Sequence, residues 1–430
     1  MQKIACLFSF KMSSWVSCQK IVFNLHKAYE HITGISLSNF NYSVDQNYDD
    51  IIQTAKDVVA SKPNVIVIMD HKPHPLPLIQ FIKIELNKKK LKTRFIFHIF
   101  GDFTLYYSEW DKLSKILVDS EVEFIVASDR QKKLIDNFLI PPHNSYVCPF
   151  PVDENEFHFD LKLRKSQREN WGIKPDDIAF VFTGRLSRQK RIHTLLEAFS
   201  DFLKKSKTRK AHLFLYGNTD HIGDQFLGIW ETEGEYFRKI NRTYKELPPQ
   251  VQNKIHFMGS VPNSELKDVY QGADYLVNLS VHNDEDFGMS VAEALCSGLP
   301  SILTDWGGLA SFSNENIPFA AQFISVKIGK ASKLVHYDEA VEILIKSLKE
   351  GHVKEREVIS KDALNRFGIT PASKILENIL HSSPSTFSKF GPLFEKILSA
   401  KSFTATPYIT PRKNINELYR EIYSSYVRDN

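Results

Sequence analysis

The feature that most constrains the fold of this chain is an alternation of short apolar runs with amphipathic helical patterns, continued from end to end. The runs NVIVIM (64–69) and IAFVFTG (178–184) are examples in which almost every residue is apolar. Continuous apolar strands that alternate with helices are typical of parallel sheets covered by helices on both faces. The sequence therefore predicts an α/β fold.

The predicted strands fall into two series, separated by a polar and charged segment at 150–177 that has no strand pattern. The first series consists of 3–10, 64–69, 94–100, 123–128 and 145–150, and the second of 178–184, 212–217, 254–259, 274–280, 300–305 and 322–326. We predict an N-terminal domain over 1–150, an interdomain connection with one helix over 151–177, and a C-terminal domain over 178–400. We expect the helical tail, 401–430, to pack back on the N-terminal domain.

Composition narrows the function classes. A net charge of +4 over 430 residues gives no reason to expect a nucleic-acid partner. The four cysteines are scattered and form no C-x-x-C pair, so neither a zinc site nor a disulfide framework is predicted. No apolar run approaches the ~20 residues of a membrane span, and the N-terminus has no signal pattern. We therefore expect a cytoplasmic protein.

Ligands of parallel sheets bind at the carboxyl ends of the strands, and the motifs of this chain follow strands. After the strand ending at Gly184, the turn carries Arg185, Arg188, Lys190 and Arg191 and leads into a helix. The first N–H groups of a helix and its dipole favour phosphate, whereas cations there oppose the dipole. We favour a phosphate site over a solvated basic turn.

The stretch EDFGMSVAEALCSGLP (285–300) places Glu285 in a loop after a strand and Glu293 inside an apolar helix. A glutamate in apolar surroundings is rarely buried without partners. Two interpretations of Glu293 would offset the cost of burying its charge. It caps the N–H groups of a neighbouring loop, or it accepts hydrogen bonds from the vicinal hydroxyls of a ribose.

Other candidates carry weaker signals. Gly307 and Gly308 follow a strand, where paired glycines allow backbone N–H groups to approach an anion, although a flexible loop is the common alternative. His98 ends a strand of the first series and is either structural or functional. The DED triplet at 284–286 matches a metal-binding pattern of sugar transferases, but the pattern is unspecific and we predict no metal. The basic stretch 81–94 is read as a solvated helix face, with contact to an anionic membrane as the second interpretation.

Together, GRLSRQK (184–190), the E-x7-E pattern of Glu285 and Glu293, and GLPSILTDWGG (298–308) resemble glycosyltransferase family 4 over roughly 178–310. This resemblance implies the GT-B fold, with two Rossmann-like domains whose parallel sheets face a central cleft. It also implies a retaining, metal-independent enzyme without a cofactor. The enzyme would transfer a sugar from a nucleotide diphosphate to the hydroxyl of a glycan or lipid-linked glycan. A role in bacterial surface polysaccharide or lipopolysaccharide synthesis is the expected setting.

The resemblance also implies residue roles. Arg185 and Lys190 would bind the donor diphosphate, Glu285 would lie beside the donor sugar, and His98 would approach that sugar from the N-terminal domain. The remaining donor-binding positions, with Glu293 at the ribose and Val261 at the base, are Gly184, Val261, Asp286, Phe287, Gly288, Met289, Glu293, Gly307 and Gly308.

The chain departs from the family pattern at four places. The loop KMSSWVS (11–17) lacks the usual glycines, and Arg191 stands where a glycine often follows the lysine. Pro151 stands where the linker often has glycine before Val152 and Asp153, and 221–250 reads as an insertion. Two alternatives to a transferase remain, a GT-B nucleotide-sugar epimerase and a non-catalytic module that binds a nucleotide sugar. Epimerases of that kind lack the E-x7-E arrangement, and the intact cations and glutamates argue against a non-catalytic site.

Overall fold

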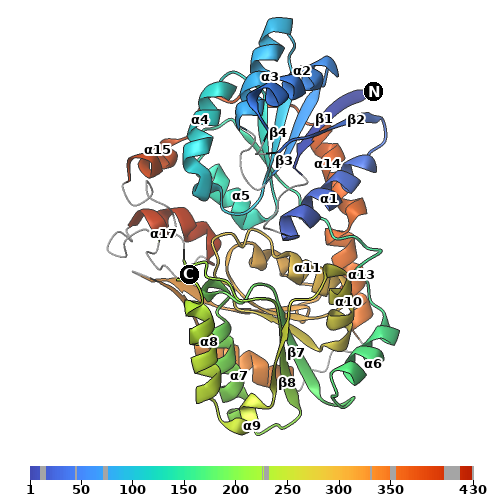
Figure 1. Ribbon diagram of the computed structural model, residues 1–430, viewed down its shortest axis with the longest axis vertical. Helices are drawn as coiled ribbons and strands as arrows, with labels where there is room; N and C mark the ends of the chain where they lie inside the picture. Colours follow the sequence, from blue (N-terminus) through green and yellow to red (C-terminus); the bar gives the residue numbers. More distant parts are fainter. Residues whose placement is uncertain are drawn as a thin grey trace. The chain divides into compact units, whose positions relative to one another are not determined.

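The structure, a computed structural model, describes residues 1–9, 16–43, 46–70, 76–224, 226, 232–329, 332–348, 355–400 and 417–428. It contains two compact units. Unit 1 consists of Met1–Pro151 and Ile369–Lys401, and unit 2 of Val152–Gly368 and Ser402–Asn430. Both units are α/β (Figure 1).

The sheet of unit 1 has six strands in the order β2-β1-β3-β4-β5-β6, and all neighbours are parallel. Its strands are β1 (Gln2–Phe8), β2 (Ile35–Asn41), β3 (Val65–Asp70), β4 (Arg94–Ile99), β5 (Val122–Val126) and β6 (Asn144–Val147). Five of them were predicted. The edge strand β2 was missed because its sequence, ISLSNFN, alternates with polar residues and is only partly buried.

Helices cover this sheet, and consecutive side chains of a strand point to its opposite faces. In β4, the Phe97 ring packs edge-on against Trp110, with centroids 5.5 Å apart, whereas the next side chain, His98, meets Tyr29 of α1. The helices of unit 1 are α1 (Val16–Glu30), α2 (Tyr48–Ala60), α3 (Leu76–Lys89), η1 (Phe103–Tyr106), α4 (Tyr107–Leu117), α5 (Asp129–Asp136), α14 (Ile369–His381) and α15 (Pro392–Ser399).

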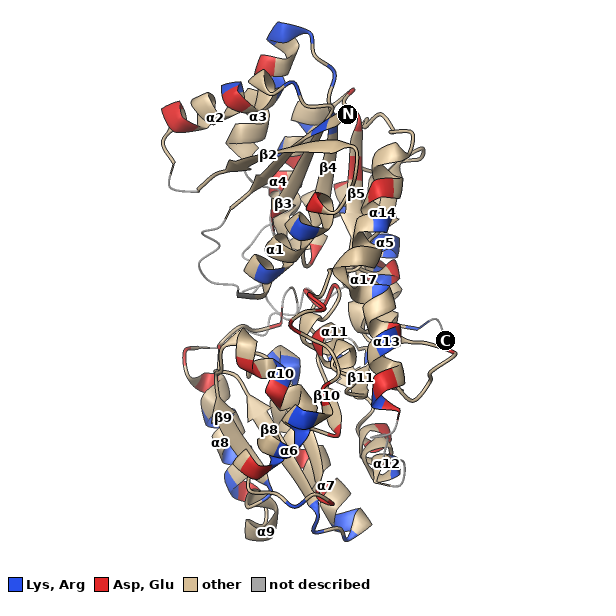
Figure 2. Ribbon diagram, turned by 90° about the vertical axis from the view of Figure 1, so that its right-hand side faces the viewer, with Lys and Arg blue, Asp and Glu red and all other residues tan. Residues whose placement is uncertain are grey.

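The basic stretch 81–94 is not one helical face, as the sequence suggested. Helix α3 ends at Lys89, and Arg94 begins strand β4, where it is buried and forms an ion pair with Glu123. The remaining lysines share the surface of α2 and α3 with carboxylates, as the mixed colours of Figure 2 show. Lysines and carboxylates mixed in this way are typical of a helix surface that faces solvent.

The sheet of unit 2 also has six parallel strands, in the order β12-β11-β10-β7-β8-β9. Its strands are β7 (Ile178–Thr183), β8 (Ala211–Tyr216), β9 (Ile255–Gly259), β10 (Tyr275–Asn278), β11 (Ser301–Thr304) and β12 (Ala321–Ile324). A separate hairpin pairs β13 (Val326–Ile328) with β14 (Lys333–Val335). All six strands of the main sheet lie where the apolar runs predicted them.

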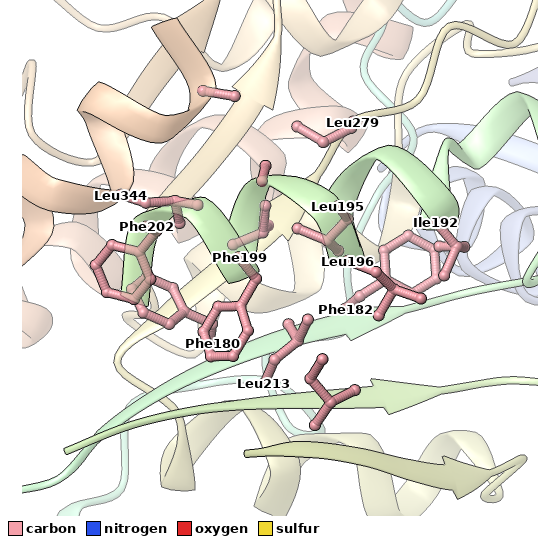
Figure 3. Close-up of a cluster of buried hydrophobic side chains, with 14 of the residues drawn as sticks. Phe180, Phe182, Ile192, Leu195, Leu196, Phe199, Phe202, Leu213, Leu279 and Leu344 are labelled. Atoms are coloured by element: carbon pink, nitrogen blue, oxygen red, sulfur yellow. The ribbon is translucent and has the colours of Figure 1, made fainter. Parts of the chain in front are cut away.

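Helix α7 fills one face of this sheet because its apolar residues recur at helical spacing. Ile192, Leu195, Leu196, Phe199 and Phe202 are buried against Phe180, Phe182 and Leu213 (Figure 3). The helical elements of unit 2 are α6 (Leu161–Asn170), η2 (Arg188–Lys190), α7 (Ile192–Ser206), α8 (Glu235–Glu246), α9 (Pro249–Gln252), α10 (Asn263–Gly272), α11 (Met289–Cys296), η3 (Gly307–Phe312), α12 (Tyr337–Ser347), α13 (Arg356–Phe367), α17 (Glu417–Tyr423) and η5 (Ser424–Tyr426).

The C-terminal region differs from the predicted division. Residues 369–401 belong to unit 1 instead of the C-terminal domain, since α14 packs along α1 and the segment at 386–390 forms β-bridges with Glu121 and Leu139. The described part of the tail, 417–428, packs on unit 2 and not on the N-terminal unit. An apolar helix pattern shows that a helix is buried but does not show which core receives it, so the sequence could not decide this.

Candidate functional site

The candidate site of unit 2 forms where the strand order reverses. Strand β7 lies between β8 and β10. The chain therefore continues from β7 toward one edge of the sheet and from β10 toward the other. Open parallel sheets bind ligands at such a point because the connecting loops separate there. The two motifs singled out in the sequence, 184–191 and 282–288, are the loops that follow β7 and β10.

The turn after β7 is built by two glycines in close contact. Gly184 has a φ of 139° and donates its N–H to the carbonyl of Tyr216 at 3.0 Å. A Cβ at Gly217 would lie 1.9 Å from the carbonyl oxygen of Gly184, so no side chain fits at Gly217. This contact brings the loops after β7 and β8 together. Arg185 consequently reaches Asp220, with Nη1 2.5 Å from Oδ2.

The four cations of the turn do not form one cluster. Arg191 adopts a left-handed conformation, with φ 56° and ψ 36°, between η2 and α7. A residue with a side chain is strained by about 1–2 kcal/mol in this region, whereas glycine is not. The Arg191 guanidinium donates to the carbonyl of Lys333 at 2.8 Å. It therefore turns away from the loops that hold Arg185 and Lys190.

Lys190 and Glu285 are brought into direct contact from positions far apart in the sequence. The ammonium of Lys190 lies 2.5 Å from Oε2 of Glu285, and the two side chains are only 15% and 7% exposed. The residue expected to act on the diphosphate and the residue expected beside the sugar thus meet at one point. A pair so shielded from solvent is a strong local electrostatic element.

The loop that carries Glu285 is fixed through its backbone. The Glu285 carbonyl accepts the N–H of Gly308 at 2.6 Å, and a Cβ at Gly308 would lie 2.0 Å from the carbonyl oxygen of Asp286. Gly288, with φ 105°, allows the turn into α11. The glycine at 308 is therefore required by the close approach of two loops. Its N–H is used within the protein, which favours this role over the anion contact that the sequence suggested for Gly308.

Glu293 is 5% exposed in α11 and accepts a hydrogen bond from the Tyr270 hydroxyl at 3.4 Å. That hydroxyl also lies 3.0 Å from the hydroxyl of Thr183, at the end of β7. Burial and the charge of Glu293 raise the pKa of Tyr270 well above its ordinary value. Glu293 thus has the Tyr270 hydroxyl among its partners, at a long distance.

His98 has a structural environment in unit 1. Its Nε2 lies 2.9 Å from the Tyr29 hydroxyl, and its side chain is 3% exposed. Burial lowers its pKa to about 3, so the imidazole is neutral at physiological pH. A histidine that is buried and already bonded in this way fits the structural interpretation better than a direct contact with a sugar.

The other predicted donor positions lie after β9 and β10. Met289 begins α11, Asp286 is buried in the loop before it, and Val261 is partly exposed in the loop after β9. The Phe287 side chain is fully buried against Phe312, with ring centroids 5.0 Å apart, so it belongs to the core. Most of the loop 11–17 lies outside the described residues.

Metal ligands do not cluster in the described ranges. No group of three or more His, Cys, Asp or Glu side chains there has the arrangement of a metal site, and this includes the DED triplet. Within the same residues, no helix is long and apolar enough to cross a bilayer.

The sequence analysis did not identify the residues that hold the loops of the site in place. Asp220 was not singled out, although a carboxylate shortly after a strand at a sheet reversal is a usable signal. Asn283, Lys333 and Tyr419 converge on the loop before Glu285, and Trp306 donates its Nε1 hydrogen to the carbonyl of His282 at 2.7 Å. Burial and the charges of Arg185, Lys190 and Lys333 lower the pKa of His282 well below its ordinary value.

Comparison with known proteins agrees with this geometry. Residues 164–357 match the family model described as glycosyl transferases group 1. Mannosylfructose-phosphate synthase of Agrobacterium fabrum is 28% identical over 179 residues, which cover 41% of this chain and 36% of that protein. N-acetyl-alpha-D-glucosaminyl L-malate synthase of Bacillus anthracis is 21% identical over 290 residues, covering 67% and 69%. The match to the Agrobacterium protein thus spans little more than a third of its length.

Among solved structures, HepE of Anabaena in complex with UDP and glucose superposes with a TM-score of 0.62 at 14% identity, covering 89% of this chain and 100% of the other. A glycosyltransferase from Rickettsia africae gives a TM-score of 0.62 at 15% identity, covering 89% and 99%. The two parallel sheets and these neighbours confirm the predicted GT-B fold.

Proposed function

We propose that this chain transfers a sugar from a nucleotide diphosphate donor to an acceptor hydroxyl, because residues 164–357 match the family model of glycosyl transferases group 1. The observation that carries the proposal is the contact between Lys190 and Glu285 at the reversal of the sheet. A cation and a carboxylate at one point suit the negative charge that develops on a leaving diphosphate and the positive character that the sugar gains.

Arg185 and Lys190 would neutralise the leaving diphosphate. Charge develops on that group as the bond to the sugar breaks, and fixed cations are most effective where solvent is excluded. Each cation is held by a carboxylate, Arg185 by Asp220 and Lys190 by Glu285. Both are therefore oriented in advance, and the diphosphate would share them with these carboxylates.

Glu285 would lie beside the donor sugar, where its charge favours the positive character that the sugar carbon gains. Glu293 would accept hydrogen bonds from the ribose in addition to Tyr270. Transfer with retention and without a metal follows from the likeness to glycosyltransferase family 4. We assign no covalent nucleophile, because the departing phosphate can itself accept the proton of the acceptor hydroxyl.

The acceptor would be a glycan or a lipid-linked glycan, and synthesis of a bacterial surface polysaccharide is the setting we propose. A cytoplasmic enzyme with peripheral contact to an anionic membrane would suit such an acceptor. The donor nucleotide is best sought first among uridine diphosphate sugars, since the Anabaena neighbour is described in complex with UDP.

The test is incubation of the protein with UDP-, GDP- and ADP-sugars, with detection of the released nucleoside diphosphate. Release that increases with an added glycan acceptor supports transfer, whereas tight donor binding without release would identify a binding module. The same assay with EDTA tests the absence of a metal. Loss of transfer that manganese or magnesium restores would show that Asp284 and Asp286 bind a cation.

A further inference from the structure

The described part of the C-terminal tail, 417–428, is anchored on the two loops that form the candidate donor site. Its apolar side is fully buried, with Tyr419, Tyr423 and Tyr426 each at most 1% exposed. Burial of three aromatic rings removes a large apolar surface from water and stabilises this attachment. The tail is therefore a fixed part of unit 2 and not a loosely attached end.

The first anchor acts on the loop of Glu285 through Asn283. The amide oxygen of Asn283 accepts two hydrogen bonds, from the Tyr419 hydroxyl at 3.1 Å and from the Lys333 ammonium at 3.0 Å. Lys333 also lies 3.2 Å from Asp224 and is completely buried. Burial alone would raise the pKa of Asp224, but the charges of Lys333 and Arg191 lower it, so the pair is ionised. Asn283 is two residues before Glu285, so these bonds fix the start of its turn.

The second anchor acts on the glycine loop. The Tyr426 ring packs edge-on against Trp306, with centroids 5.6 Å apart, and a Cβ at Gly307 would lie 3.2 Å from that ring. Arg428 forms an ion pair with Asp305 at 2.9 Å. Trp306 and Gly308 in turn bond to the carbonyls of His282 and Glu285. Movement of the tail would thus release both loops together.

We propose that Tyr419 and Asn283 are positioning residues for the donor, and that docking of segment 417–428 and donor binding are coupled. This inference rests on the proposed function, because it assigns the tail to the same site. Coupling is reciprocal, so a bound nucleotide must hold the tail as strongly as the tail supports the nucleotide.

The test compares Tyr419→Phe, Asn283→Leu and Asn283→Asp, with Arg420→Ala as the matched control on the exposed side of α17. UDP, GDP and ADP are titrated against the wild type by calorimetry, and the tightest of them is used throughout. We expect Tyr419→Phe to weaken its binding roughly five- to tenfold, the effect of one lost buried hydrogen bond. Asn283→Leu should weaken it further, and Asn283→Asp, which retains both acceptor bonds, should recover most of the loss. Arg420→Ala should bind as the wild type does.

A second readout is amide hydrogen exchange in 417–428, measured with and without the nucleotide. We expect the nucleotide to slow exchange there in the wild type and less so in Tyr419→Phe. Unchanged exchange together with wild-type affinity in Tyr419→Phe would overturn the coupling while leaving the transferase proposal intact. If the wild type binds none of the three nucleotides and releases none from the sugars, both proposals fail. Equal losses in Asn283→Leu and Asn283→Asp would also overturn the positioning role.

Discussion

Lys190 and Glu285 allow stability and turnover to be separated by substitution. If Lys190 lay on an exposed turn, its truncation would lower the free energy of unfolding only slightly. In the structure, however, the side chains of Lys190 and Glu285 are only 15% and 7% exposed. Removing one member of a buried pair leaves the other charge uncompensated, at about 3–5 kcal/mol. Because Lys190 keeps some exposure, we expect about 3 kcal/mol for Lys190→Met, the low end of that range. Melting of unit 2 should then fall by roughly 6–12 °C, at about 2–4 °C per kcal/mol.

The informative variant combines Lys190→Met with Glu285→Gln. It leaves no buried charge unpaired, so its stability should return to within about 1 kcal/mol of the wild type. Turnover should be lowered by about 10²–10³ in Lys190→Met and remain as low in the double variant, because the leaving diphosphate has lost a fixed cation in both. The assays are thermal unfolding followed by circular dichroism and release of nucleoside diphosphate well below the melting temperature. Lys190→Met that melts within 1–2 °C of the wild type, by roughly the scale above, would refute the pairing. Turnover that returns in the double variant would refute the catalytic role.

Three further predictions use the same assays. Arg185→Ala should melt within about 2 °C of the wild type, because its pair with Asp220 is partly exposed to solvent, yet its turnover should fall about 10²-fold. Full turnover would remove Arg185 from the diphosphate site. Glu293→Gln should weaken nucleoside diphosphate binding by about 10- to 100-fold, while Glu285→Gln lowers kcat more than affinity. Unchanged affinity in Glu293→Gln would leave Glu293 a structural residue. Burial holds the pKa of His98 at about 3 against 6.5 when unfolded, so the unfolded chain takes up the proton first. The contribution of His98 to the free energy of unfolding should be complete above pH 6.5 and should fall below that pH by about 1.4 kcal/mol per pH unit. Equal urea midpoints for unit 1 at pH 7.5 and 5.5 would contradict this prediction.

The strands of both sheets were predictable because continuous apolar runs are a strong local signal. Strand β2 was missed since it lies at an edge and alternates with polar residues, and the β13–β14 hairpin is too short to leave a pattern. The loops of the candidate site were also predictable, because a motif that follows a strand must lie at the carboxyl end of the sheet. The sequence alone could not show which of them touch.

Side-chain direction was the part that the sequence left open. Arg185, Arg188, Lys190 and Arg191 were treated as one cationic turn, whereas the left-handed residue at 191 turns its guanidinium toward Lys333. Gly308 was read as an anion contact, and its small size is used for the approach of Asp286. Contacts between segments more than a hundred residues apart, such as Tyr419 with Asn283, leave no periodic trace in the chain.

The return of residues 369–401 to unit 1 has a consequence for exchanging domains between relatives. Phe390 and Phe394 complete an aromatic cluster in that unit, with ring centroids 5.6 and 6.2 Å from Phe103. A chimera with a single junction near Pro151 would take residues 1–151 of unit 1 from one relative and residues 369–401 from the other. The two halves of the aromatic cluster would then come from different parents and match poorly in shape. Exchanging unit 1 between relatives therefore requires two junctions, with 369–401 carried together with 1–151.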